Sequence, residues 1–184
     1  MTKLSADQSA TARSRAYLLL GRLFLRGVTD ETLEHVRAVE PLADQLEAFP
    51  HEEGEIDLDE AAASYQDLFG FNVFPFQSTY LDETARAGGE ETQKVIDFYR
   101  EAGFPIVKTA ESADHLGVEL NFLGFLAKIE SQTEGEDYRR VRQFSRRFLD
   151  DHLLLLDAHL GHKSSLFEHL LKNVNDLPHV RRLQ

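Results

Sequence analysis

An aspartate, a histidine and a glutamate stand close together at the start of an apolar stretch in the chain. The stretch reads ESADHLGVELNFLGFLAKIE and contains Asp114, His115 and, four residues later, Glu119. Residues four apart lie on one face of a helix, so His115 and Glu119 are close enough to share a metal ion or to tune each other's proton affinity. A structural role is equally compatible, in which Asp114 stabilises the helix N-terminus and Glu119 pairs with an arginine or accepts backbone hydrogen bonds.

No second motif supports a metal site or a catalytic centre. A di-iron helix bundle needs paired Glu-x-x-His motifs, and no second ligand pair with matching spacing is present. The chain contains no cysteine and no Gly-x-Ser-x-Gly segment, and Gly88-Gly89 lacks the lysine that follows in a phosphate loop. We therefore expect no cofactor, no metal and no catalysis. A metal- or acid–base-dependent helical enzyme using His115 and Glu119 is the alternative interpretation.

Five arginines form a cluster further along the chain. They are Arg139, Arg140, Arg142, Arg146 and Arg147. Such a cluster can clamp a phosphate or an acidic partner. On an amphipathic helix it more often forms a solvated face that pairs with nearby acids, and this is the interpretation we favour.

The composition is that of a folded protein with an acidic surface. The chain has 184 residues, of which 42% are hydrophobic and 28% charged, and its net charge is −12. The length suits one domain over residues 1–184, and the charge argues against binding to nucleic acid. No apolar run is long enough to span a membrane, and no secretory signal is visible, so we expect a cytoplasmic protein without stable membrane insertion.

Apolar residues recur at helical spacing through most of the chain, which predicts an all-α fold. The predicted helices span residues 9–25, 30–50, 58–69, 90–102, 111–130, 136–160 and 166–174. Gly27 is the predicted stop of the first helix, Asp30 the cap of the second and Ser112 the cap of the helix over 111–130. That helix is apolar on two sides, which predicts a central position, and Gly117 and Gly124 would allow a neighbour to approach closely.

The connection FGFNVFPFQSTYLDE is unusually aromatic for a loop. Phe69, Phe71, Phe74 and Phe76 surround Pro75, which interrupts helical hydrogen bonding. Loops are normally polar, so this loop is expected to pack on the core or to line a site.

Two motifs in this order resemble the TorD/DmsD family of cytoplasmic chaperones for molybdoenzyme maturation. The first is a Tyr-x-x-Leu-Phe helix end followed by a Pro-x-x-Ser-x-Tyr loop, and the second is a Glu-x-x-Asp-His-Leu segment running into an apolar helix with an internal Glu-Leu. The matching residues are Tyr65, Leu68, Phe69, Pro75, Ser78, Tyr80, Glu111, Asp114, His115, Leu116, Glu119 and Leu120. The resemblance covers most of the chain.

The resemblance implies a TorD-like helical bundle that acts as a chaperone, as a monomer or a domain-swapped dimer. Its partner would be the apo form of a molybdopterin oxidoreductase catalytic subunit. The chaperone would bind the twin-arginine leader peptide of this subunit before cofactor insertion and export. The residues expected to bind the client are Asp114, His115, Glu111, Ser78, Tyr80, Phe76, Pro75 and Glu119.

The chemistry of a twin-arginine leader fits these residue types. Two guanidinium groups next to an apolar segment call for carboxylates beside an apolar groove. Asp114 and Glu111 would supply the carboxylates, and the aromatic loop would supply the groove. This hypothesis requires residues 71–80 to lie next to residues 111–115 in the folded protein.

Overall fold

The structure is a computed structural model that describes residues 6–38, 58–72, 74–81, 88–106 and 111–153. Within these ranges every regular element is helical and no strand is formed, which confirms the predicted all-α class. The predicted helix over 166–174 and the later parts of those over 30–50 and 136–160 lie outside the described residues. Extension of one domain over all of residues 1–184 stays a prediction.

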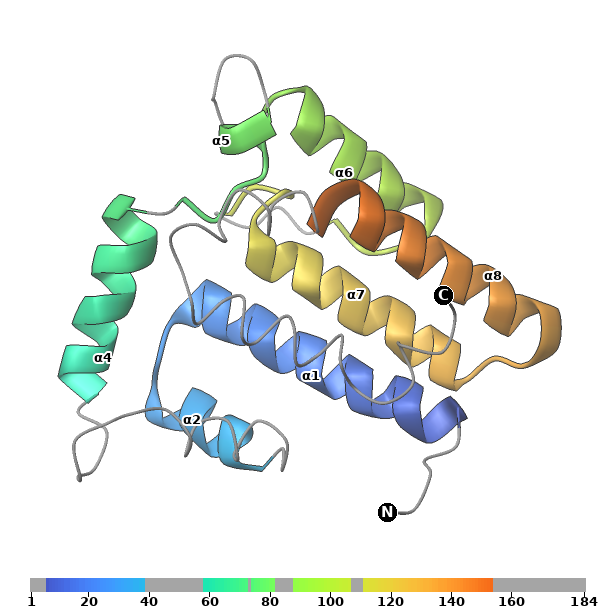
Figure 1. Cartoon of the computed structure of the whole chain (residues 1–184), viewed down its shortest axis with the longest axis horizontal. Coiled ribbons are helices and arrows are strands. Elements are labelled where there is room, and N and C mark those ends of the chain that lie inside the picture. Colours follow the sequence, from blue (N-terminus) through green and yellow to red (C-terminus); the bar gives the residue numbers. More distant parts are fainter. Residues whose placement is uncertain (1–5, 39–57, 73, 82–87, 107–110, 154–184) are drawn as a thin grey trace.

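The centre of the fold is an antiparallel pair, α1 (Ala6–Arg26) and α7 (Leu116–Ser131) (Figure 1). Glycines bring the two backbones close. A Cβ added to Gly117 would lie 2.8 Å from the carbonyl oxygen of Gly21 and 2.6 Å from Leu25, and one added to Gly124 would lie 2.7 Å from Leu18. The close approach predicted from Gly117 and Gly124 is therefore confirmed.

Two further helices, α6 (Glu90–Glu101) and α8 (Gly135–Phe148), pack on α7 through aromatic rings (Figure 1). Phe122 of α7 lies 4.6 Å from Tyr99 and 4.8 Å from Phe148, measured between ring centroids. Phe98 of α6 adds an edge contact with Phe144 of α8. Tilted and edge-on pairs of this kind add about 0.5–1.5 kcal/mol each beyond area burial, so the aromatic cluster orients α6 and α8 on the central helix.

Local sequence explains the ends of the first two helices. Gly27 stops α1 with a positive φ of 73°, as predicted, and its N–H donates to the carbonyl of Leu23. The predicted cap of α2 (Asp30–Arg37) was wrong by one residue: Thr29 is the cap, and its hydroxyl accepts from the N–H of Thr32. Thr29 is favoured over Asp30 as the cap because the Thr32 hydroxyl also accepts from the Thr29 N–H, which completes a capping box.

Helix α4 (Leu58–Tyr65) continues into a π-helical segment, η1 (Gln66–Asn72), and both lie to one side of the main bundle (Figure 1). Aromatic residues anchor α4 and η1 to α1. The Tyr65 hydroxyl donates to the carbonyl of Phe24 over 2.7 Å, and the Phe69 ring meets the Phe24 ring at 5.2 Å. The aromatic loop follows and ends in one short turn of helix, α5 (Ser78–Leu81).

Helix α8 begins one residue before the predicted start, ends at Phe148 and continues as a π-helical segment, η2 (Leu149–Leu153). Residues 154–160 of the predicted helix lie outside the described residues. In the described part of the chain, no helix combines the length and apolar character needed to cross a bilayer.

Candidate functional site

The aromatic loop lies directly against the start of α7. Phe76 and His115 form an isolated antiparallel bridge, and their rings meet edge to face at 5.0 Å. The N–H of Leu116, the first residue of α7, donates to the carbonyl of Pro75 over 2.8 Å. A helix N-terminus has N–H groups without intrahelical partners, and here the loop supplies an acceptor. We call residues 75–78 and 112–116 together the loop–helix junction.

Asp114 is the centre of this junction and is completely buried. Its carboxylate accepts the backbone N–H of Ser78 over 2.9 Å and the hydroxyl of Ser112, while its backbone carbonyl accepts the N–H of Gln77 over 3.2 Å. Burial by itself would raise the pKa of Asp114, but the hydrogen bonds from Ser112 and Ser78 outweigh burial and hold the pKa below its usual value. Asp114 is therefore an ionised group that fastens the loop to the helix.

His115, and not the predicted Ser112, caps α7. Its Nδ1 accepts the N–H of Gly117 over 3.0 Å, so the neutral ring carries its proton on Nε2. Burial lowers the pKa of His115, against the opposing effect of the Glu111 and Asp114 charges. Ser112 is displaced from the cap because its hydroxyl donates to Asp114 instead, and the first turn starts three residues later than predicted.

Glu119 lies one turn into α7 and is completely buried. Among the described residues, neither of its carboxyl oxygens has a hydrogen-bond partner, so neither the expected arginine nor a backbone donor is found there. Burial, reinforced by the negative charge of Asp114, raises the pKa of Glu119 well above its ordinary value. Glu119 is therefore a core acid whose raised pKa favours its protonated form.

This arrangement makes stability fall as the pH rises. In the unfolded chain Glu119 ionises at its ordinary pKa, whereas in the folded protein it retains its proton to higher pH. The stabilisation is fully present below the ordinary pKa and is lost as the pH rises through the raised folded pKa. Urea unfolding of Glu119→Gln between about pH 5 and pH 8 should show a smaller decline in the free energy of unfolding than wild type. Equal declines in both proteins would contradict this assignment.

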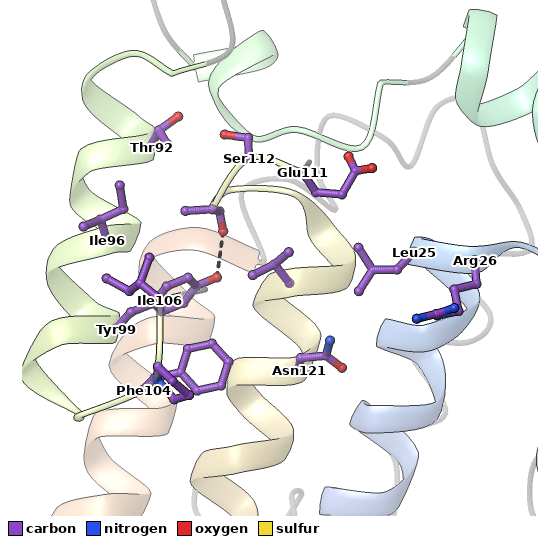
Figure 2. Close-up of a pocket in the computed structure, with 13 residues that line it drawn as sticks. Leu25, Arg26, Thr92, Ile96, Tyr99, Phe104, Ile106, Glu111, Ser112 and Asn121 are labelled. Atoms are coloured by element: carbon purple, nitrogen blue, oxygen red, sulfur yellow. Dashed lines mark hydrogen bonds between the residues drawn. The ribbon is translucent and has the colours of Figure 1, made fainter. Parts of the chain in front are cut away.

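A hollow of about 650 Å³ opens beside the junction (Figure 2). Its floor is α7, through Val118 and Asn121, and α6 and α1 form its sides, through residues that include Ile96 and Leu25. The segment that follows α6 contributes Phe104 to Ile106, and Glu111 to Ala113 form the end nearest the junction. Most of the lining is apolar, so the hollow suits an apolar ligand.

The mouth of the hollow carries one group of each charge. Figure 2 shows Glu111 at the end nearest the junction and Arg26 on the α1 side. Deeper inside, the Tyr99 hydroxyl donates to the carbonyl of Ala113 over 2.8 Å, which fixes the segment leading into α7. A ligand with an apolar body and a cationic group would place that group near Glu111.

The structure brings the predicted site residues together but gives them different surroundings. The loop residues 75–80 and the helix start meet, as the peptide-groove hypothesis requires. Asp114, His115, Ser78 and Glu119 are buried, and among the predicted client-binding residues only Glu111 lines the hollow.

The aromatic loop faces elsewhere. Phe76 and Tyr80 are half-buried, whereas Phe71 and Phe74 are 71% and 46% exposed. None of these rings lines the hollow. The walls of the hollow were missed because Leu25, Ile96 and Phe104 read as ordinary core residues in the sequence. Asn121 was the one available hint, since it is a polar residue inside an apolar helix.

The arginine cluster is largely paired with acids, as favoured from the sequence. Arg139 and Arg140 approach Glu136, and Arg147 bonds to Glu101 over 2.8 Å. Arg142 is different, because it reaches the buried Glu130. The cluster therefore forms ion pairs on the surface of α8 and contributes Arg142 to one internal ion pair.

The geometry does not favour the enzyme alternative. Among the described residues, no group of three histidine, aspartate or glutamate side chains is placed to hold a metal ion. The His115 Nδ1 accepts the N–H of Gly117 at the helix N-terminus, and burial raises the pKa of Glu119, which favours its protonated form. The fold and the site define an all-helical protein with an apolar hollow beside a buried polar junction.

Comparison with known proteins specifies this class. Residues 30–155 match the family described as nitrate reductase delta subunit, which is more than half of the chain. The protein therefore belongs to the nitrate reductase delta subunit family, whose members are chaperones of molybdoenzyme maturation and not enzymes. This match supports the chaperone family and not the narrower TorD/DmsD assignment. No curated protein and no solved structure matches the chain.

Proposed function

We propose that this protein is a cytoplasmic chaperone that binds the apo catalytic subunit of a molybdenum-containing oxidoreductase through its leader peptide, before cofactor insertion. A leader of the twin-arginine type combines an apolar segment with two guanidinium groups. The observation that carries the proposal is the hollow, because it joins an apolar floor to the carboxylate of Glu111 at its mouth.

The residues of the site have two roles in this proposal. Glu111, with the apolar residues of the hollow, would contact the leader. Asp114, His115 and the loop residues Pro75 to Ser78 would position that surface, because they tie the loop to the start of α7. Phe76 and Tyr80 would support the junction from the loop side, and Glu119 would lie beneath it. TorD/DmsD membership and a monomeric or domain-swapped dimeric state are parts of the proposal that the resemblance suggests.

Affinity for a leader peptide tests the proposal. The probe is a synthetic twin-arginine leader peptide of a molybdoenzyme catalytic subunit, and its affinity is measured by titration calorimetry. Ile106 lines the hollow and is 48% exposed, so Ile106→Asp should leave the fold intact. It should weaken binding at least about tenfold, because an aspartate would be desolvated against the apolar peptide. Glu111→Gln should weaken it by about fivefold, the effect of losing one charge-assisted hydrogen bond at a partly exposed site.

The matched control is Glu134→Gln, which removes the same charge at the other end of α7. It should leave the affinity unchanged. A second control is a peptide with both arginines replaced by lysine, which retains the charge but loses bidentate pairing. Wild-type affinity in folded Ile106→Asp and Glu111→Gln proteins would refute the placement of the peptide in this hollow.

A further inference from the structure

Asn121 places a polar amide in the floor of a hollow whose lining is mostly apolar. It follows Val118 by three residues on α7, so the two side chains lie on the same face of that helix. Figure 2 shows the Asn121 side chain extending from α7 toward α1, on the side of Leu25 and Arg26. The amide offers two donor hydrogens and an acceptor oxygen, and no hydrogen bond joins it to another of the described residues. It is therefore available to a ligand in the hollow.

Gly21 of α1 leaves the room that this amide occupies. A Cβ at Gly21 would overlap the Oδ1 atom of Asn121 and would lie 2.8 Å from the carbonyl oxygen of Gly117. A larger residue at position 21 would therefore displace the amide as well as separate the two helices. Because α1 and α7 together fix its position, the amide belongs to the rigid centre of the fold and is held ready for a ligand.

The other uncharged polar side chains that line the hollow already have partners within the protein. Tyr99 and Ser112 donate their hydroxyl hydrogens to groups of the segment that precedes α7. The Thr92 hydroxyl accepts an N–H from the turn before α6 over 3.1 Å. Among the uncharged polar groups of this lining, Asn121 is thus the one that a ligand can engage without breaking a bond inside the protein.

An extended polypeptide supplies the partner that this amide lacks. In a helix the backbone N–H and C=O groups are paired with one another, whereas in an extended segment they need outside partners. One carboxamide can donate to a backbone C=O and accept a backbone N–H of the same segment, as a neighbouring strand does. A backbone group pressed against an apolar floor without such a partner loses its hydrogen bond to water at a cost. The amide therefore favours an extended main chain over an apolar small molecule or a helical segment.

We propose that Asn121 binds the main chain of the leader peptide and makes the hollow specific for an extended polypeptide. The apolar side chains of the leader would contact the walls, and Glu111 would pair with a guanidinium group at the mouth. Every residue has a backbone amide, so Asn121 would hold leaders whose apolar side chains differ. This inference rests on the proposed function, because it assigns a specificity-determining residue to the same hollow.

Asn121→Leu tests the residue, because leucine has nearly the same shape as asparagine and no hydrogen-bonding group. In titration calorimetry this variant should bind a twin-arginine leader peptide about fivefold more weakly, the effect of losing a neutral hydrogen bond. The uncharged dye N-phenyl-1-naphthylamine probes the apolar surface alone, and its affinity should not fall. The matched control is Gln143→Leu, which removes an amide at an exposed position on α8 and should change neither affinity. Equal leader affinity in Asn121→Leu and wild type would overturn the proposal.

Leader peptides with a single backbone ester test the main-chain contact on the wild-type protein. Each peptide of the series replaces one amide of the apolar segment by an ester, which removes one N–H, weakens one carbonyl acceptor and retains every side chain. At one position the ester should weaken binding to wild type about fivefold, and the same ester should have little effect on binding to Asn121→Leu.

The ester series also separates this inference from the proposed function. If wild type binds the unmodified leader and no position shows this coupling to Asn121, main-chain binding by Asn121 is refuted while the proposed function stands. If wild type does not bind the unmodified leader, the proposed function fails, and this inference fails with it.

Discussion

Replacing Glu130 with alanine is expected to lower the free energy of unfolding by about 3–5 kcal/mol, the range for removing one partner of a buried ion pair. Glu130 lies near the end of α7 and is buried, and a single carboxylate oxygen accepts Arg13 over 2.6 Å and Arg142 over 2.8 Å. Arg13 is itself buried and also donates to the hydroxyl of Ser9. Removing the carboxylate would leave the buried guanidinium of Arg13 and the partly buried guanidinium of Arg142 without their shared acceptor.

Urea unfolding followed by circular dichroism measures this loss, and Glu136→Ala, at an exposed position on α8, is the control. That control should change stability by less than about 1 kcal/mol, because surface ion pairs contribute little. A triple variant with Arg13→Met, Glu130→Leu and Arg142→Met should recover most of the stability, since apolar residues of similar size often replace a buried charge network without loss. A fall of less than 1 kcal/mol in Glu130→Ala would show that the ion pairs are not structural.

Replacing Asp114 with alanine is expected to lower the free energy of unfolding by about 2–4 kcal/mol. The substitution leaves the buried N–H of Ser78 and the half-buried hydroxyl of Ser112 without their acceptor, and an orphaned buried group costs about 1–3 kcal/mol. The loop should detach from α7, so leader binding should weaken as well. The loss of binding should therefore be accompanied by a loss of stability that follows from the burial of Asp114.

The pH dependence of this variant identifies the cause. The folded pKa of Asp114 is lowered, so its stabilisation is present above the ordinary pKa of an aspartate and is lost as the pH falls through the lower folded value. Asp114→Ala should therefore lose less stability than wild type on acidification below about pH 4. Asp97→Ala, at an exposed position on α6, is the control. A variant with wild-type stability and wild-type acid sensitivity would show that Asp114 does not fasten the loop.

The two acids at the start of α7, Asp114 just before its N-cap and Glu119 in its first turn, respond to pH in opposite directions for one physical reason. Asp114 receives hydrogen bonds that stabilise its charge, whereas Glu119 receives none from the described residues and is buried near that charge. Both are aspartate- or glutamate-type groups within one and a half turns of the chain. Residue type and sequence position do not distinguish these two acids. Their hydrogen-bond partners in the folded protein do.

The helices themselves could be predicted from the sequence because their causes are local. Apolar spacing places α1, α4, α6 and α7 within five residues of their observed bounds, and it places the start of α8 within one residue. Gly27 ends α1 because a positive φ suits glycine, and Gly117 and Gly124 allow the close packing of α1 against α7. The errors were also local: Thr29 and His115 replaced the predicted caps, since their own hydrogen bonds compete better for the same N–H groups.

Taken alone, the sequence determined the all-α class and the two motifs that point to a chaperone, because periodicity and residue order are properties of the chain. It also led to the hypothesis that the aromatic loop and the Asp-His pair lie next to each other in the folded protein. Tertiary structure decided which side chains are buried, and therefore that Asp114 and His115 hold the junction while Glu111 faces the hollow. Burial and pairing depend on residues distant in the chain, as with Arg13 and Glu130, 117 positions apart, and no local pattern encodes them.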